Sequence, residues 1–101
     1  MKINEITSKD VVGFLRLSEG EYTETEIAAM MAAAESFISR YTGLPKESTG
    51  GKTIYDYDDF WIAYMALCQD MNDNRTFTVS EDKMNPAVKI ILDMGAHNLV
   101  G

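Results

Sequence analysis

The sequence contains 101 residues, enough for one domain with a single modest core. Nine Lys and Arg residues against sixteen Asp and Glu residues give a net charge of −7, so the chain lacks the clustered positive charge of a free-standing nucleic-acid binder. The single cysteine, Cys68, excludes an intrachain disulfide and every multi-cysteine zinc pattern.

Residues 1–6 form a lead-in that we expect to be extended, and a short helix follows as far as about Leu17. Thr7 or Ser8 can cap this helix, and Asp10 lies in its first turn. Gly13 inside the helix weakens the prediction because glycine is a poor helix former. Residues 18–22 then form a polar, acidic link.

The clearest helix lies between Thr23 and Gly43. Thr23 and Glu26 have capping-box spacing, Gly43 supplies a left-handed end, and Pro45 prevents the helix from resuming. Apolar side chains recur at three- and four-residue spacing and predict one buried stripe. This stripe consists of Ile27, Met30, Met31, Ala34, Phe37, Ile38 and Tyr41.

The opposite side of this helix carries small residues where a solvated face would carry charges. They are Ala28, Ala29, Ala32, Ala33 and Ser36. A small-residue surface lets a second helix or another subunit approach closely, and we take it as the predicted subunit interface. Alanine is also the best helix former, and this simpler explanation has equal weight.

After a loop over residues 44–54, a third helix is predicted from about Asp56 to Asp73. Asp56 can cap this helix, and Asp58 and Asp59 then lie in its first turn. We favour this capping role of the three aspartates over a Ca²⁺ site, because a Ca²⁺ loop needs further ligands and a glycine turn that are missing here. Its apolar residues surround almost the whole helix, so it is either the centre of the core or meets another subunit with its extra face. The main stripe consists of Tyr57, Phe60, Trp61, Tyr64, Leu67, Cys68 and Met71.

Residues 76–79 alternate and predict an edge strand or extended arm. Asn85 then caps a fourth helix that has Pro86 at its first position and continues through Leu92. Gly95 is expected to end or loosen this helix and leave residues 96–100 as a tail. The chain is therefore predicted to be all-α: a bundle of about four helices with a long central antiparallel helix pair, and with a short extended hairpin or arm as an option.

No catalytic, cofactor-binding or metal-binding constellation is recognisable. His97 is the only histidine and has no nucleophile at a recognisable spacing, and Cys68 lies within an apolar helix, where a thiol is usually inert. The longest apolar run, residues 60–68, is too short to span a bilayer, and no signal-peptide pattern opens the sequence. We expect a soluble intracellular protein that is not an enzyme.

The order of these elements resembles a known family. An alanine-rich helix ends in Arg40-Tyr41-Thr42-Gly43, an aromatic helix ends near Asp73-Asn74-Arg75, and a last helix is followed by His97-Asn98-Leu99. Nearly the whole chain is similar to the head–tail connector (adaptor) proteins of tailed bacteriophages, which are often described as DNA-packaging proteins. Each motif is weak alone, and the ordered set carries the resemblance.

The resemblance implies a structural subunit of a twelvefold virion ring that forms in the host cytoplasm. The ring would sit beneath the portal protein, extend the DNA channel without binding DNA specifically, and dock a stopper or tail-completion protein. By analogy, the portal would be contacted by Ile90, Ile91, Met94, Leu99 and Val100. The loops at 44–54 and 75–84 would make inter-subunit or tail-side contacts. The alternative is a monomeric or dimeric all-α regulator that binds a partner protein.

Overall fold

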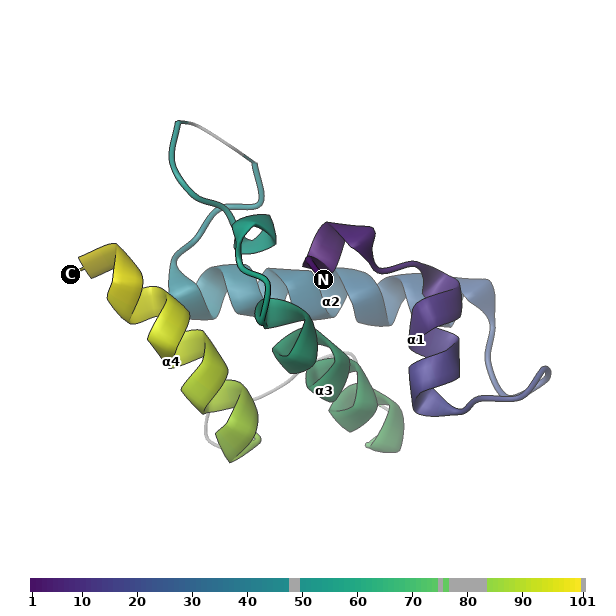
Figure 1. Ribbon diagram of the computed structural model, residues 1–101. Coiled ribbons are helices and arrows are strands. Elements are labelled where there is room, and N and C mark those ends of the chain that lie inside the picture. Colours follow the sequence, from purple (N-terminus) through teal and green to yellow (C-terminus); the bar gives the residue numbers. More distant parts are fainter. Residues whose placement is uncertain (48–49, 75, 77–83, 101) are drawn as a thin grey trace.

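The chain forms an all-α bundle, as predicted (Figure 1). This computed structural model describes residues 1–47, 50–74, 76 and 84–100, with side chains described as far as residue 95. Within that part of the chain there are four α-helices, two short 3-10 helices and no strand. The elements are η1 (Ile3–Glu5), α1 (Ser8–Leu15), α2 (Glu24–Thr42), η2 (Ile54–Asp56), α3 (Phe60–Asp73) and α4 (Pro86–Val100).

Helix α3 lies at the centre of the molecule and contacts α1, α2, α4 and η1. It runs antiparallel to α4, and the longest helix, α2, crosses behind this pair (Figure 1). Helix α1 packs against α2 and α3 at the other end of the molecule. The antiparallel pair in the structure is thus α3 with α4, whereas α2, the longest predicted helix, crosses both. Of the extended arm predicted over residues 76–79, all but Thr76 lies outside the described residues.

Helix α2 has the boundaries that its capping residues predict. The Thr23 hydroxyl oxygen accepts a hydrogen bond from the Glu26 backbone N–H at 3.1 Å, and the Glu26 carboxylate accepts one from the Thr23 N–H at 3.1 Å. At the other end, Gly43 has a left-handed backbone with φ of 77°. The predicted stripe of this helix forms part of the core, with Met31 and Tyr41 half-buried and the other members buried.

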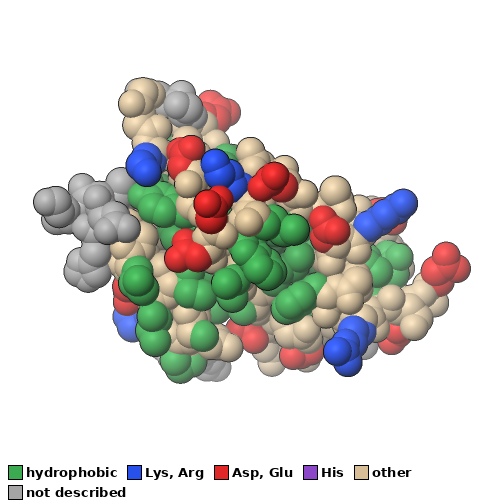
Figure 2. Space-filling view, viewed as in Figure 1, with side chains coloured by type: hydrophobic (Ala, Val, Ile, Leu, Met, Phe, Trp, Pro, Cys, Tyr) green, Lys and Arg blue, Asp and Glu red, His purple; other side chains and the backbone are tan. Residues whose placement is uncertain are grey.

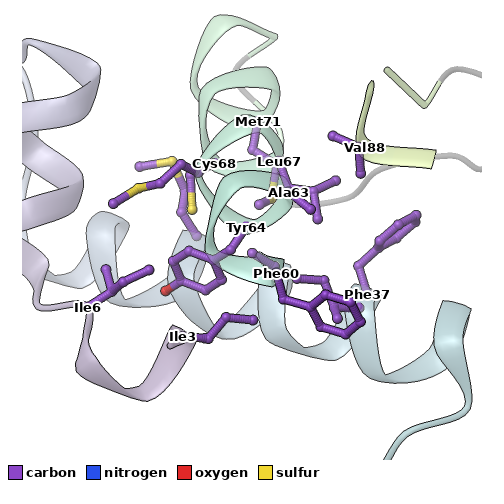
Figure 3. Packing of buried hydrophobic residues seen from close by; sticks show 14 of the residues in the cluster. Ile3, Ile6, Phe37, Phe60, Ala63, Tyr64, Leu67, Cys68, Met71 and Val88 are labelled. Atoms are coloured by element: carbon purple, nitrogen blue, oxygen red, sulfur yellow. The ribbon is translucent and has the colours of Figure 1, made fainter. Parts of the chain in front are cut away.

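The core is built around α3, which confirms the prediction that this helix is buried. Side chains from η1, α2 and α4, among them Ile3, Phe37 and Val88, lie around it in Figure 3, where the Tyr64 ring lies beside Ile3 and Ile6. Residues of α3 that are almost fully buried are Phe60, Ala63, Tyr64, Met65, Leu67, Cys68 and Met71.

The beginning of the chain differs from the prediction. Residues 3–5 form the 3-10 helix η1 instead of an extended lead-in, and Ile3 and Ile6 are buried in the core. Thr7 caps α1, as predicted, but α1 ends at Leu15 because Arg16 adopts a left-handed backbone with φ of 57°. The prediction was wrong here because apolar residues at positions 3 and 6 have no local pattern that indicates tertiary burial.

The start of α3 was also predicted wrongly. Asp56 does not cap this helix: it ends η2, where its carboxylate accepts a hydrogen bond from the Thr53 backbone N–H at 2.6 Å. Asp58 and Asp59 precede the first turn of α3, which begins at Phe60. The reason is that the Thr53–Asp56 capping box closes a separate short turn, which buries Ile54 before α3 begins.

Helix α4 begins as predicted but does not end near Gly95. The Asn85 side-chain oxygen accepts a hydrogen bond from the Ala87 N–H at 2.8 Å, and the helix continues through Val100. Gly95 is buried, and a Cβ atom at this position would lie 2.4 Å from Cζ of Phe60. The glycine therefore serves close packing of α4 on α3, not helix termination.

Candidate interaction surfaces

The outer side of α4 carries two exposed aliphatic residues, Ile90 and Met94, one helical turn apart. Both side chains are 61% exposed. The opposite side of the helix buries Val88 and Leu92 in the core, and Ile91 between the two sides is half-buried. We call Ile90 and Met94 the α4 ridge. The helix is thus apolar on the outside as well as on its packed face, which is unusual for a surface helix.

Helix α3 contributes a further exposed aliphatic residue, Ile62, which is 46% exposed. Figure 2 shows hydrophobic side chains gathered over α4 and over the beginning of α3 on one face of the molecule. Scattered exposed apolar residues need no explanation, but several on neighbouring helices are typical of a surface that another protein covers.

Not all of the residues expected to dock the portal can be placed. Ile90 and Met94 are exposed and Ile91 is partly accessible, so the structure brings these three to one helix with two of them on its outer side. Leu99 and Val100 lie in the last turn of α4, but their side chains lie outside the described part of the chain.

A polar cluster holds α4 against the end of α2. The Tyr41 hydroxyl donates a hydrogen bond to the Asp93 carboxylate at 2.6 Å, and the Lys89 ammonium donates to the Tyr41 hydroxyl at 3.4 Å and to Asp93 at 3.3 Å. The hydrogen bond to Asp93 is the main reason that the pKa of Tyr41 is raised. The pKa of Lys89 is also raised, chiefly by its hydrogen bond to Tyr41. These contacts fix which side of α4 faces outward.

The small residues of α2 remain accessible. Ala28 and Ala32 are exposed, whereas Ala29, Ala33 and Ser36 are half-buried. The Ser36 hydroxyl accepts a hydrogen bond from the Lys46 ammonium at 3.3 Å. The residues of the predicted subunit interface are therefore all at least partly accessible, and the alanines at its centre have side chains no larger than a methyl group.

Sequence reasoning missed one hollow in the surface. A depression of about 410 Å³ lies between the acidic link, the first half of α2 and the end of α3. The residues that line it include Leu17, Tyr22, Glu26, Met30, Met71 and Thr76. They come from two stretches far apart in the sequence, residues 17–30 and 71–76, so no local signal could have found this depression. The Glu26 carboxylate at its edge is already used in capping α2.

The chemistry of the described side chains is sparse. Cys68 is buried, and this burial raises the pKa of its thiol to about 12, so the reactive thiolate is disfavoured at neutral pH. Among the described residues no group of His, Cys, Asp and Glu side chains has the arrangement of a metal site. In the same part of the chain no helix has the length and apolar character needed to cross a membrane.

Comparison of the chain with known protein families, with curated proteins and with solved structures finds no match in any of the three.

Proposed function

We propose that the chain is a structural subunit of a tailed-bacteriophage head–tail connector, located in the virion and assembled in the host cytoplasm. It would form a ring, twelvefold by analogy with the family it resembles, that extends the DNA channel beneath the portal protein and docks a stopper or tail-completion protein. Such a role is mechanical and requires no active site.

The observation that carries this proposal is the α4 ridge. Full burial of an Ile or Met side chain is worth about 1.5–3 kcal/mol, so covering the exposed part of Ile90 and Met94 would contribute about 1–2 kcal/mol each. Most interface residues contribute less than about 1 kcal/mol, so two contacts of this size would be a substantial part of a binding energy. The ridge therefore suits a protein partner, and the resemblance proposes the portal as that partner.

Two further features support a ring around DNA. The small residues on α2 allow a neighbouring subunit to approach closely, so we propose them as the lateral interface. The net charge of −7 disfavours adhesion to DNA phosphates, and a duplex can slide past an acidic wall without being held. Specific DNA binding is not part of the proposal.

The docking contact is tested by the substitution Ile90→Glu on the exposed side of α4. We expect this variant to lose capture by the cognate portal oligomer while keeping the far-UV circular dichroism of the wild type. Asn4→Glu is the matched control because Asn4 is exposed in η1, away from α4, and gains the same charge. If Ile90→Glu is captured no worse than Asn4→Glu, the α4 ridge is not the docking surface.

The lateral contact is tested by Ala32→Arg, which places a long charged side chain at the centre of the small-residue surface. We expect portal-templated rings, viewed by negative-stain microscopy, to be lost. Asn4→Arg, at an exposed position in η1, adds the same charge and should leave ring formation intact. A wild-type chain that never assembles on the portal, and instead binds a different protein as a monomer or dimer, would favour the regulator function.

A further inference from the structure

The depression between the acidic link and the end of α3 has a bottom and a rim of different chemistry. Met30 and Met71 are almost fully buried, so they form its bottom. Leu17 and Tyr22 are half-buried and form its sides. The volume of about 410 Å³ falls within the range of about 300–1,000 Å³ that is typical of ligand-binding pockets. Methionine side chains adapt to partners of different shape, which suits the bottom of a binding site.

Two exposed carboxylates, those of Glu21 and Glu26, lie at the rim of this depression. Each is held by a backbone group of its own segment. The Glu21 carboxylate accepts a hydrogen bond from the Ser18 N–H at 2.6 Å, and the Glu26 carboxylate accepts one from the Thr23 N–H at 3.1 Å. A carboxylate has about four acceptor sites, so both groups can still bind a further donor. Their positions are fixed before a ligand arrives, which lowers the entropic cost of binding.

The negative charge around the rim is not balanced by nearby positive charge. Residues 17–39 contain no Lys or Arg, whereas residues 19–26 alone contain four glutamates. At the end of α3, Asp70 and Asp73 flank Asn72, which lines the depression. Burial raises the pKa of Asp70, and the charge of Asp73 raises it further. Among the described residues, the ion pairs include none of these carboxylates.

A Lys or Arg side chain matches both parts of this depression. Its apolar stem can lie along the two methionines at the bottom while its charged head reaches the carboxylates at the rim, which is the usual way in which these amphipathic side chains are accommodated. Hydrogen bonds between a guanidinium or ammonium group and a carboxylate are shorter and stronger than those between neutral groups. An acidic ligand would be repelled by the rim, and a purely apolar one would leave both carboxylates without a new partner.

We propose that the depression binds a basic segment of a second protein, in which a Lys or Arg side chain flanked by apolar residues lies on Met30 and Met71 and meets the carboxylates of Glu21 and Glu26. The depression lies at the α1 end of the molecule and the α4 ridge at the opposite end, so both surfaces can be occupied at once (Figure 1). This second site goes beyond the proposed function and does not depend on it.

The probe for this site is the capped pentapeptide Leu-Arg-Leu-Arg-Leu, titrated into the whole chain at physiological salt and followed by amide chemical shifts in NMR spectra. We expect saturable binding with a Kd below about 1 mM and shift changes concentrated in residues 17–30 and 71–76. The double variant E21Q/E26Q should bind about tenfold more weakly, because two charged contacts are lost. Glutamine keeps an acceptor oxygen for the backbone N–H groups, so this variant should stay folded.

The double variant E5Q/E47Q is the matched control. Glu5 and Glu47 are exposed, do not line the depression, and give the same change in net charge when replaced. This control should bind the probe as the wild type does, which separates the site from general attraction of a basic peptide to an acidic protein. The peptide Gly-Arg-Gly-Arg-Gly should bind more weakly than the probe because it lacks the flanking apolar side chains.

Four results would each overturn the site: no saturable binding of the probe by the wild type, equal affinity of the two double variants, equal affinity of the two peptides, or shift changes centred outside residues 17–30 and 71–76. None of them bears on the connector role, which portal capture of the wild-type chain tests at the other end of the molecule. A failure of portal capture would in turn leave the peptide site standing.

Discussion

Replacing Gly95 by alanine should destabilise the protein, although the same substitution inside most helices stabilises the folded state. Alanine is favoured over glycine in a helix interior by about 1 kcal/mol. At Gly95, however, the new Cβ would lie 2.4 Å from Cζ and 2.5 Å from Cε1 of Phe60, whereas carbon atoms pack at about 3.5–4.0 Å. The ring would have to move by more than about 1 Å.

The surroundings of Phe60 leave it little room to move. Its side chain is fully buried and stacks on Tyr57 with the ring centroids 4.6 Å apart. Overpacking of this kind costs about 1–3 kcal/mol. After the helix-propensity gain of about 1 kcal/mol, we expect Gly95→Ala to lower the free energy of unfolding by up to about 2 kcal/mol.

Gly13→Ala is the matched control for this experiment. Gly13 lies inside α1, has no positive φ, and a Cβ there would have no neighbour within 4 Å. This variant should gain up to about 1 kcal/mol. Urea unfolding followed by circular dichroism measures both changes, and a double-mutant cycle with Phe60→Leu should show that Gly95→Ala is tolerated better beside the smaller side chain. Equal stabilisation by the two alanine substitutions would refute the close-packing argument.

Three other changes have definite expected results. Arg16→Gly should raise the free energy of unfolding by up to about 1 kcal/mol in urea titrations, because Arg16 has a left-handed backbone that glycine adopts without strain; no gain would contradict that strain. Tyr41→Phe should cost about 1 kcal/mol in the same assay by removing the hydrogen bond to Asp93, and an unchanged midpoint would show that this bond is not a net stabiliser. Burial raises the pKa of the Cys68 thiol to about 12, above the value of about 8.5 in the unfolded chain. The neutral thiol therefore stabilises the fold fully below about pH 8.5, and this contribution is lost as the pH rises toward 12. Between these values the free energy of unfolding of the wild type should fall more steeply than that of Cys68→Ala, by up to about 1.4 kcal/mol per pH unit, and parallel curves would contradict this.

Local signals in the sequence predicted much of the fold. The ends of α2 follow from Thr23, Glu26 and Gly43 because capping depends on residues within one or two turns. The buried stripes of α2 and α3 follow from helical spacing for the same reason. The start of α4 follows from Asn85 and Pro86.

One error arose where residues far apart in sequence decide the structure. Glycine often ends a helix, and only the contact of Gly95 with Phe60, 35 positions earlier, explains why it lies within α4. Tertiary packing overrides local preference at this position. The error at Asp56 is local instead: aspartate can cap a helix, but this one pairs with Thr53, three positions earlier, in a separate turn.

The candidate surfaces were only partly predictable. The spacing along α2 and α4 places Ala32 and Ile90 on particular sides of their helices, but whether a side is covered depends on how the helices pack. The structure leaves Ala32 exposed and Ile90 61% exposed. The identity of the partner cannot follow from packing, because an apolar side chain offers similar affinity to any complementary apolar surface.

The burial of Ile3 and Ile6 has a consequence for synthesis of the protein. These two residues leave the ribosome well before α3, which begins at Phe60, yet η1 packs against that helix. Until translation has passed the end of α3, the nascent chain must carry both isoleucines without this cover. The core can therefore close only after α3 has been made, and a ribosome stalled before α3 would present a chain that chaperones recognise.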